Sequence, residues 1–147
     1  MKHLFVQASL ALSMSIVSAA PFLVSPQEVD ASNSASVKFT AKSAPVKDAP
    51  LIHLVTPQLS APIESPTSIE LKFESMLPSK VKVETLRVLY GAFQLDITKR
   101  ILGVAEVTAK GVLVREARLP NGKHKLTVIL EDSEGRIGEK LIEFEVR

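Results

Sequence analysis

The sequence predicts an all-β fold, an antiparallel β-sandwich of about seven short strands, preceded by a disordered N-terminal segment. From residue 51 onward, short stretches alternate apolar and polar residues, as strands with one buried face do. Turn-forming residues recur about every 8 to 15 residues, and no helical pattern reaches three turns. The chain has 147 residues, of which 23% are charged and 46% apolar, and this suits one globular domain with short appendages.

The residue types that are missing exclude several classes of protein. The chain has no Cys, which rules out a disulfide scaffold, a thiolate zinc site and a cysteine nucleophile. Its 18 basic and 16 acidic side chains give a formal net charge of +2, which offers no basis for nucleic-acid binding. With one Tyr and no Trp, the chain also lacks the aromatic platform on which many sugars and bases stack.

The first 20 residues have the pattern of a secretory signal peptide. Lys2 is the only formal charge, a mostly apolar stretch of about 14 residues follows, and small residues close the segment. We expect residues 1–19 to be the signal peptide, cut after Ala19 or, alternatively, after Ala20. An uncleaved membrane anchor would need about 20 consecutive apolar residues. The sequence therefore predicts a periplasmic or extracellular protein without a stable membrane span after cleavage.

Residues 20–50 are expected to form a flexible tail. Pro, Ser and Ala are frequent in this segment, and its few large apolar groups cannot offset the entropy of ordering the backbone. Its strand-like feature is the alternation of Val37 and Phe39 around Lys38, which would give a short edge strand.

The predicted sandwich domain covers residues 51–147 and opens with two strands. LIHLVT (51–56) is rich in β-formers, whereas the prolines of 57–66 cannot donate ladder hydrogen bonds and indicate an irregular edge or loop. SIELKFES (68–75) alternates strictly, so that one face of this strand is buried and the other is wet.

The next strand is predicted to contain an irregularity. LPSK (77–80) is a turn, and the apolar phase then slips by one between Val83 and Leu86. Because such a slip turns side chains to the opposite face, we place a loop or bulge before the strand proper at 84–90, which ends at Gly91.

Residues 93–108 leave two interpretations open. The alternation of Phe93, Leu95 and Ile97 favours a strand, but Ile97 could also share one face of a short helix with Ile101 and Leu102. We predict a strand, a helical turn and a short strand near 104–108.

The last third of the chain predicts three further strands. GVLVREA (111–117) begins at a glycine, and KLTVILED (125–132) and KLIEFEV (140–146) flank the turn SEGRIG (133–138) as a C-terminal hairpin. Since each strand has one apolar face, two sheets would hide each other's apolar faces, as in an immunoglobulin-like sandwich.

Several motifs resemble those of bacterial extracytoplasmic Ig-like domains. A Pro-rich opening from Pro57 leads into SIELKF and then TLRVLYG, and the chain ends with LPNGKHKLTVILEDSEGRIGEKLIEFEV. The resemblance covers about residues 50–147 and implies a sandwich that serves as a spacer, adhesin segment, sugar-binding module or assembly part. The matching positions in the final motif are Leu119, Gly122, His124, Leu126, Val128, Asp132, Gly135, Phe144 and Val146.

A second resemblance is to small periplasmic copper-carrying sandwiches. HLVTPQLSAPIESPTSIELKF is similar to their first segment, which has a His, a Pro-rich stretch and a strand of the form I-x-L-x-F. That family binds copper through clusters of His, Asp or Met, so the resemblance draws attention to His53, His124 and Met76. The chain departs from the family because His53 lies well inside the expected mature chain and not at its first residue.

Each candidate site also has a plainer structural interpretation, which we favour. A metal site needs three or four donors, so His53 and His124 are expected to be half-exposed strand residues. The run from Asp132 to Gly135 has the alternating acids of a calcium loop but not its further oxygen ligands. We therefore expect a polar hairpin turn there, in which Gly135 takes a positive φ.

The remaining polar residues give no pattern of a catalytic site. Asp96 and Glu106 are possible paired carboxylates, but nothing in the sequence sets the separation that glycoside cleavage needs. Lys99-Arg100 and Lys123-His124-Lys125 could contact anionic polymers, although the balanced charge of the domain favours solvated loop charge. We expect no catalytic, cofactor-binding or metal-binding residues and no cofactor.

The sequence thus predicts a non-catalytic binding or structural module. On a rigid sandwich, binding residues commonly lie on the loops, and an exposed sheet edge can pair with a strand of another protein. We therefore expect a protein partner in the cell envelope that is contacted through a sheet edge or end loops. One alternative is a periplasmic copper carrier, which predicts a rise in melting temperature with metal. Another is a hydrolase, which predicts a concave pocket lined with acids of perturbed pKa.

Overall fold

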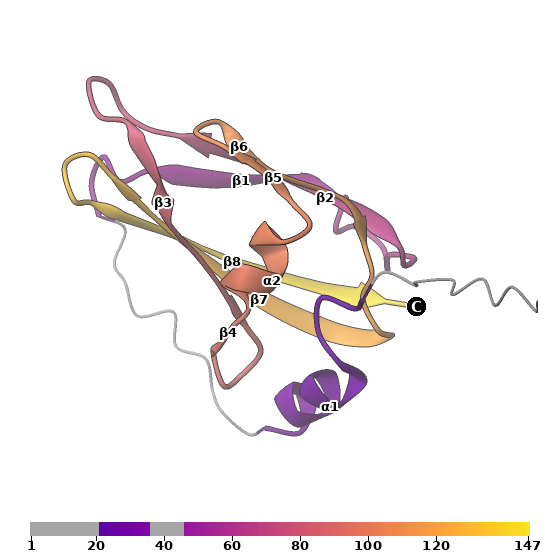
Figure 1. The fold of residues 1–147 in the computed structure, drawn as a ribbon. Coiled ribbons are helices and arrows are strands. Elements are labelled where there is room, and N and C mark those ends of the chain that lie inside the picture. Colours follow the sequence, from indigo (N-terminus) through magenta and orange to yellow (C-terminus); the bar gives the residue numbers. More distant parts are fainter. Residues whose placement is uncertain (1–20, 36–45) are drawn as a thin grey trace, which may run out of the picture.

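The computed structural model describes residues 21–35 and 46–147, which form two β-sheets packed face to face (Figure 1). Every pairing between the named strands is antiparallel, which confirms the predicted all-β sandwich. The described residues contain eight strands, where about seven were expected. The elements in chain order are α1 (Pro26–Ser34), β1 (Leu51–Thr56), β2 (Thr67–Glu74), β3 (Val81–Tyr90), β4 (Leu95–Asp96), α2 (Thr98–Leu102), β5 (Glu106–Thr108), β6 (Gly111–Ala117), β7 (Gly122–Asp132) and β8 (Ile137–Val146).

The strand order identifies the type of sandwich. Sheet A has the order β1-β2-β6-β5, and sheet B has the order β4-β3-β7-β8. An immunoglobulin sandwich places its strands A, B, E and D in one sheet and C, F and G in the other, and larger variants add a strand beside C. In chain order, sheet A corresponds to A, B, E and D, and sheet B to the added strand, C, F and G. The chain therefore has the immunoglobulin-like arrangement that its sequence predicts.

The core lies between the two sheets and is built from the alternating positions of the strands. On β2, Leu71 and Phe73 are buried, while the charged residues that follow each of them are exposed. Full burial of one such side chain stabilises the fold by about 1.5–3 kcal/mol, which lets a domain without disulfides hold together. The C-terminal hairpin adds a further buried row: Leu126, Val128, Leu130, Ile142 and Val146.

The predicted irregularity in the third strand is confirmed. The register of β3 against β7 shifts between Lys82 and Arg87. Within this bulge the Thr85 hydroxyl donates to the Lys82 carbonyl at 2.7 Å and accepts from the Glu131 N–H at 2.9 Å, so the displaced backbone groups keep hydrogen-bond partners. The strand itself starts at Val81 and not at residue 84. The predicted strand, helical turn and short strand of 93–108 are likewise confirmed by β4, α2 and β5.

The expectation of a flexible tail is wrong for residues 21–35. α1 begins with a capping box, in which the Ser25 hydroxyl accepts from the Glu28 N–H and the Glu28 carboxylate accepts from the Ser25 N–H. Pro26 follows at the start of the helix, where its missing N–H has no intrahelical partner to lose. The few apolar groups of this segment suffice to order it because they are placed in the core of the sandwich: Leu23, Val24 and Val29.

Two glycines of the sandwich leave room for α1. A Cβ atom at Gly91 would lie 2.6 Å from the Ser32 hydroxyl, and one at Gly122 would lie 3.0 Å from Cγ1 of Val29. Both glycines also have a positive φ, of 69° and 130°, which other residues rarely adopt. The backbone at this end of the sandwich therefore fits the helix closely.

Some expectations fall on residues that the structure does not describe. These are the signal peptide at 1–19, its cleavage after Ala19 or Ala20, and the alternation around Lys38. Among the described helices, none is long and apolar enough to cross a membrane.

Candidate functional site

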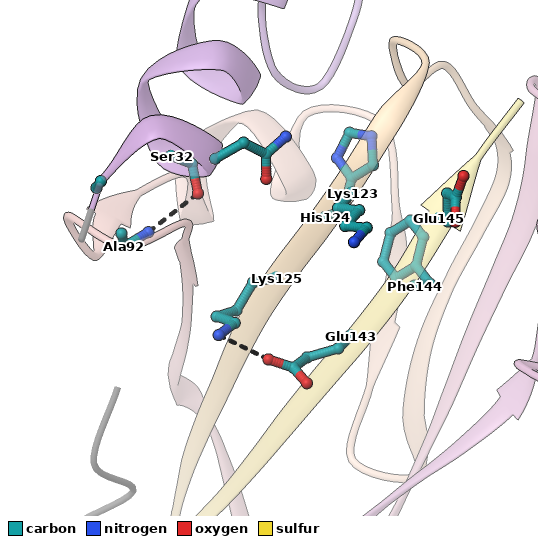
Figure 2. Close-up of a pocket in the computed structure, with 10 residues that line it drawn as sticks. Ser32, Ala92, Lys123, His124, Lys125, Glu143, Phe144 and Glu145 are labelled. Atoms are coloured by element: carbon teal, nitrogen blue, oxygen red, sulfur yellow. Dashed lines mark hydrogen bonds and ion pairs between the residues drawn. The ribbon is translucent and has the colours of Figure 1, made fainter. Parts of the chain in front are cut away.

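A groove lies between the C-terminal end of α1 and the β7–β8 pair, and we call it the α1 groove (Figure 2). Its cavity volume is about 460 Å³. Three separate parts of the chain meet there: α1, the turn after β3 and the last two strands. The Ala92 N–H donates to the Ser32 hydroxyl at 3.1 Å and so joins the first two. The lining residues are Ser32, Asn33, Ala35, Ala92, Lys123, His124, Lys125, Glu143, Phe144 and Glu145.

His124 is buried beside this groove, with 2% of its surface exposed, and the expectation of a half-exposed residue is wrong. Its position on β7 has the same parity as Leu126 and Val128, so its side chain faces the core. Its ring stacks on Phe144, with ring centres 5.2 Å apart and planes 13° apart (Figure 2). The histidine therefore acts as part of the hydrophobic core at this end of the sandwich.

Both nitrogens of the His124 ring have partners. Nε2 lies 2.8 Å from the Pro120 carbonyl, which can only accept, so Nε2 carries the proton. Nδ1 lies 3.1 Å from the Tyr90 hydroxyl and accepts from it. Burial lowers the pKa of His124, against the smaller opposing effect of the bond to Pro120. Burial also raises the pKa of Tyr90 to about 12, with a contribution from the charge of Glu28. At neutral pH the pair is uncharged.

The rim of the α1 groove carries two rows of opposite charge. Lys125 pairs with Glu143 at 2.6 Å across the two strands, and Lys123 lies opposite Glu145 in the ladder (Figure 2). Glu145 also lies 3.6 Å from Arg147. Lysines on β7 thus run beside glutamates on β8, and a ligand in the groove meets charges of both signs.

An ion pair at the start of α1 fixes the helix that forms one wall. Arg100 of α2 donates to both carboxylate oxygens of Glu28 at 2.9 Å, and also to the Leu23 carbonyl at 3.3 Å. The bond from Arg100, helped by the Ser25 N–H and opposed by burial, lowers the pKa of Glu28 to about 2. Lys99-Arg100 was considered as a basic cluster for anionic polymers. In the structure, Arg100 instead holds α1 in place through Glu28.

The free sheet edges differ in what they can accept. β4 and β5 are edge strands of two and three residues, which offer little backbone to a partner. β1 and β8 are longer, and a second hollow of about 360 Å³, which we call the β8 hollow, lies beside them. It is lined by His53, Leu54, Pro57, Gln58, Leu59, Lys140, Leu141 and Ile142. A sheet edge and end loops were the two expected contact surfaces. β8 belongs to both, because it is an edge strand of sheet B and its last residues line the α1 groove at one end of the sandwich.

The two candidate histidines do not share a site. His53 lies on β1 in sheet A, about half-exposed as expected, with Nε2 3.2 Å from the Glu74 carboxylate. His124 lies on β7 in sheet B, and Met76 lies in the loop after β2. Within residues 21–35 and 46–147, no three His, Asp or Glu side chains are grouped closely enough to hold a metal ion.

The acidic run at Asp132 forms the predicted hairpin turn, with Gly135 at a φ of 75°. The fully buried Asp132 carboxylate accepts from the N–H groups of Glu134 and Arg136 at 2.9 Å and from the Arg136 guanidinium at 2.8 Å. Burial acts to raise the pKa of Asp132, but these bonds outweigh it and hold the pKa below its usual value. The aspartate is a structural centre of the turn.

The possible catalytic carboxylates are separated by the fold. Asp96 lies on β4 of sheet B, where it pairs with Arg87 at 3.4 Å and accepts from the Thr98 N–H at 2.9 Å. Glu106 lies on β5 of sheet A and pairs with Arg115 at 2.8 Å. Each acid therefore has its own partner in its own sheet.

Two features of the site had signals in the sequence that our predictions did not use. Ser25-Pro26 followed by Glu28 is a capping box with Pro at the first helical position, which indicates a helix start. His124 continues the alternation of Leu126 and Val128 by one step, which indicates a buried histidine. The contact between these two segments had no local signal.

Comparison with known proteins adds a distant structural likeness. No protein-family model and no curated protein matches the chain. Among solved structures, CopC from Methylosinus trichosporium OB3b is similar, with a TM-score of 0.41 and 19% sequence identity, over 65% of this chain and 93% of that chain. The fold assignment rests on the strand order of this chain's own sheets, and the resemblance to copper-carrying sandwiches stays a prediction.

Proposed function

We propose that this protein is a non-catalytic binding module of the periplasm or cell exterior, which contacts a protein partner on the β8 side of its sandwich. The observation that carries the proposal is the α1 groove, an open hollow of mixed charge held between a packed helix and two paired strands. Sites for small molecules are mostly apolar with few polar groups, whereas protein contacts commonly include charged rims of both signs. The predicted signal peptide supports the location.

The engagement of the acids supports a role in binding over one in catalysis. Asp96, Glu106 and Asp132 are each held by an arginine. A general acid needs a raised pKa, and the pKa values of Asp96 and Asp132 are lowered. For Asp96 the main causes are the hydroxyl and N–H of Thr98.

Site-specific photo-crosslinking in the native cell envelope tests this proposal. A photoreactive residue at Asn33, which is exposed and lines the groove, should form a covalent adduct with one protein partner. The matched control is Glu116, an exposed position on β6 of sheet A, which should not form that adduct. The same adducts from both positions, or none from Asn33, would contradict binding on the β8 side.

A further inference from the structure

β8 has a free edge whose ability to pair is already shown by the chain itself. In the described part of the chain, β8 pairs along its length with β7 and meets Ile63 in a parallel bridge at Val146. The Ile63 N–H donates to the Glu145 carbonyl at 2.8 Å, and the Arg147 N–H donates to the Ile63 carbonyl at 3.0 Å. The bridge covers one end of the edge only.

The direction of these bonds shows which backbone N–H and C=O groups of β8 point away from β7. Backbone groups point to the same side of a strand at every second residue. Since those of Glu145 and Arg147 point away from β7, the N–H and C=O groups of Glu139, Leu141 and Glu143 do so as well. Gly138, at the other end, lies against the Pro50 carbonyl, which a Cβ atom there would strike. The open window is therefore 139–143.

A hollow borders this window on the side that faces β1. The β8 hollow of about 360 Å³ borders Lys140, Leu141 and Ile142 on one side and β1 with the start of the following loop on the other. Leu54, which is partly buried, and Leu59, which is 43% exposed, contribute apolar surface to the hollow. The polar side chains of its lining are His53, Gln58 and Lys140. An incoming strand would place every second side chain in this hollow, in reach of the two leucines.

The charges along the window define the remaining side chains of the partner. Glu139 and Glu143 are exposed and share the outer face of sheet B. Glu143 pairs with Lys125, whereas Glu139 has no ion-pair partner among the described residues. Opposite charges directly across neighbouring strands stabilise pairing, so basic side chains fit opposite both glutamates.

We propose that the free edge of β8 over residues 139–143 binds an extended peptide segment of a protein partner, in which basic side chains alternate with apolar ones. The added strand satisfies the outward N–H and C=O groups, its basic side chains face Glu139 and Glu143, and its apolar side chains enter the β8 hollow. This inference rests on the proposed function, because it names the partner's chemistry on the same side of the sandwich.

The test is an NMR titration of the mature chain with a capped hexapeptide, Lys-Val-Thr-Val-Lys-Val. Shift changes should map to 139–143 and to Leu54 and Leu59. Methylation of the peptide nitrogens that face β8 should abolish binding, because it removes the ladder donors. Shifts that map elsewhere, or binding that survives methylation, would overturn the inference.

Two variants test the contacts on the protein. Leu141→Pro removes an N–H that points away from β7 and should weaken binding about 10-fold, while amide exchange in β7 shows that the ladder to β8 persists. Glu139→Lys should weaken binding about 5-fold and favour the charge-reversed peptide Glu-Val-Thr-Val-Glu-Val. Its matched control, Glu116→Lys, makes the same charge change in sheet A and should leave binding unchanged.

The outcomes separate this inference from the function on which it rests. If peptide binding is absent while the adduct from Asn33 forms, the edge inference fails and the proposed function stands. If both are absent, both fail. A dimer in sedimentation that is lost in Leu141→Pro would place a second copy of the chain on this edge and would overturn the peptide proposal.

Discussion

The substitution Arg100→Gln tests whether α1 is held as one wall of the groove. It removes two charged hydrogen bonds to Glu28 at 2.9 Å and one to the Leu23 carbonyl at 3.3 Å. Hydrogen bonds to charged groups contribute about 1.5–3 kcal/mol when shielded. The Glu28 and Arg100 side chains are 24% and 45% exposed, so solvent weakens the pair. We expect the free energy of unfolding to fall by about 1–2 kcal/mol.

Urea unfolding and amide exchange together measure this effect. The matched control is Arg115→Gln, because the Arg115–Glu106 pair has a similar distance but side chains that are 69% and 62% exposed. This substitution should lower the free energy of unfolding by about 0–1 kcal/mol. In Arg100→Gln the Leu23 N–H, which donates to the Arg118 carbonyl, should also exchange faster. Equal losses in both variants, with unchanged exchange at Leu23, would refute the clamp.

Acid titration gives a second signature of the same contact. The pKa of Glu28 is lowered from 4.5 to about 2, chiefly by the bond from Arg100. A lowered carboxylate pKa means that the unfolded state binds protons first, so this stabilisation is complete above about pH 4.5 and is lost as pH falls through 2. The difference in urea midpoint between wild type and Arg100→Gln should therefore shrink in acid. A constant difference would contradict the assignment.

Four further predictions follow from the geometry. Gly91→Ala should lower the free energy of unfolding by about 2–4 kcal/mol, because the new Cβ would lie 2.6 Å from a hydroxyl of α1. Gly135→Ala has a similar φ but open space around it, so it should lower the free energy of unfolding by about 1 kcal/mol in the same urea experiment. Burial lowers the pKa of His124 below its value of 6.5 in the unfolded chain, so the stabilisation from the neutral ring is complete above pH 6.5 and is lost as pH falls through the lower pKa of the folded state. The urea midpoint of the wild type should therefore fall in acid, and it should fall less in His124→Gln. Asp132→Asn should lower the urea midpoint by weakening the bonds within its turn, and an unchanged midpoint would contradict its central role. Added Cu²⁺ should leave the melting temperatures of wild type and His53→Ala equal, whereas a rise confined to the wild type would favour the copper-carrier hypothesis.

Most of the sandwich follows from local patterns in the sequence. A strand with one buried face repeats every two residues, and this period is visible in 68–75 and in the C-terminal hairpin. Even the bulge in β3 was predictable, because a slip in the period between Val83 and Leu86 has few other causes. Boundaries shifted by a few residues where a strand continued past its apolar stretch, as β3 does at Val81.

The α1 groove could not be predicted in the same way. The start of α1 has a local signal at Ser25 and Glu28, but the helix has little apolar periodicity and its stability comes from contacts across the chain. Val29 is buried against a sandwich end whose shape depends on Gly91 and Gly122, and Glu28 is paired with an arginine 72 residues away. Counting apolar groups in the segment alone therefore underestimated its order.

The most direct test of binding on the β8 side is competition in the crosslinking experiment at Asn33. We expect one adduct of defined mass from this position, which unlabelled wild-type protein displaces and which the control at Glu116 does not form. Displacement by wild type but not by Leu141→Pro would show that the groove and the edge of β8 bind the same partner. An adduct that wild-type protein fails to displace, or that forms equally from Glu116, would contradict a specific protein contact on this side of the sandwich.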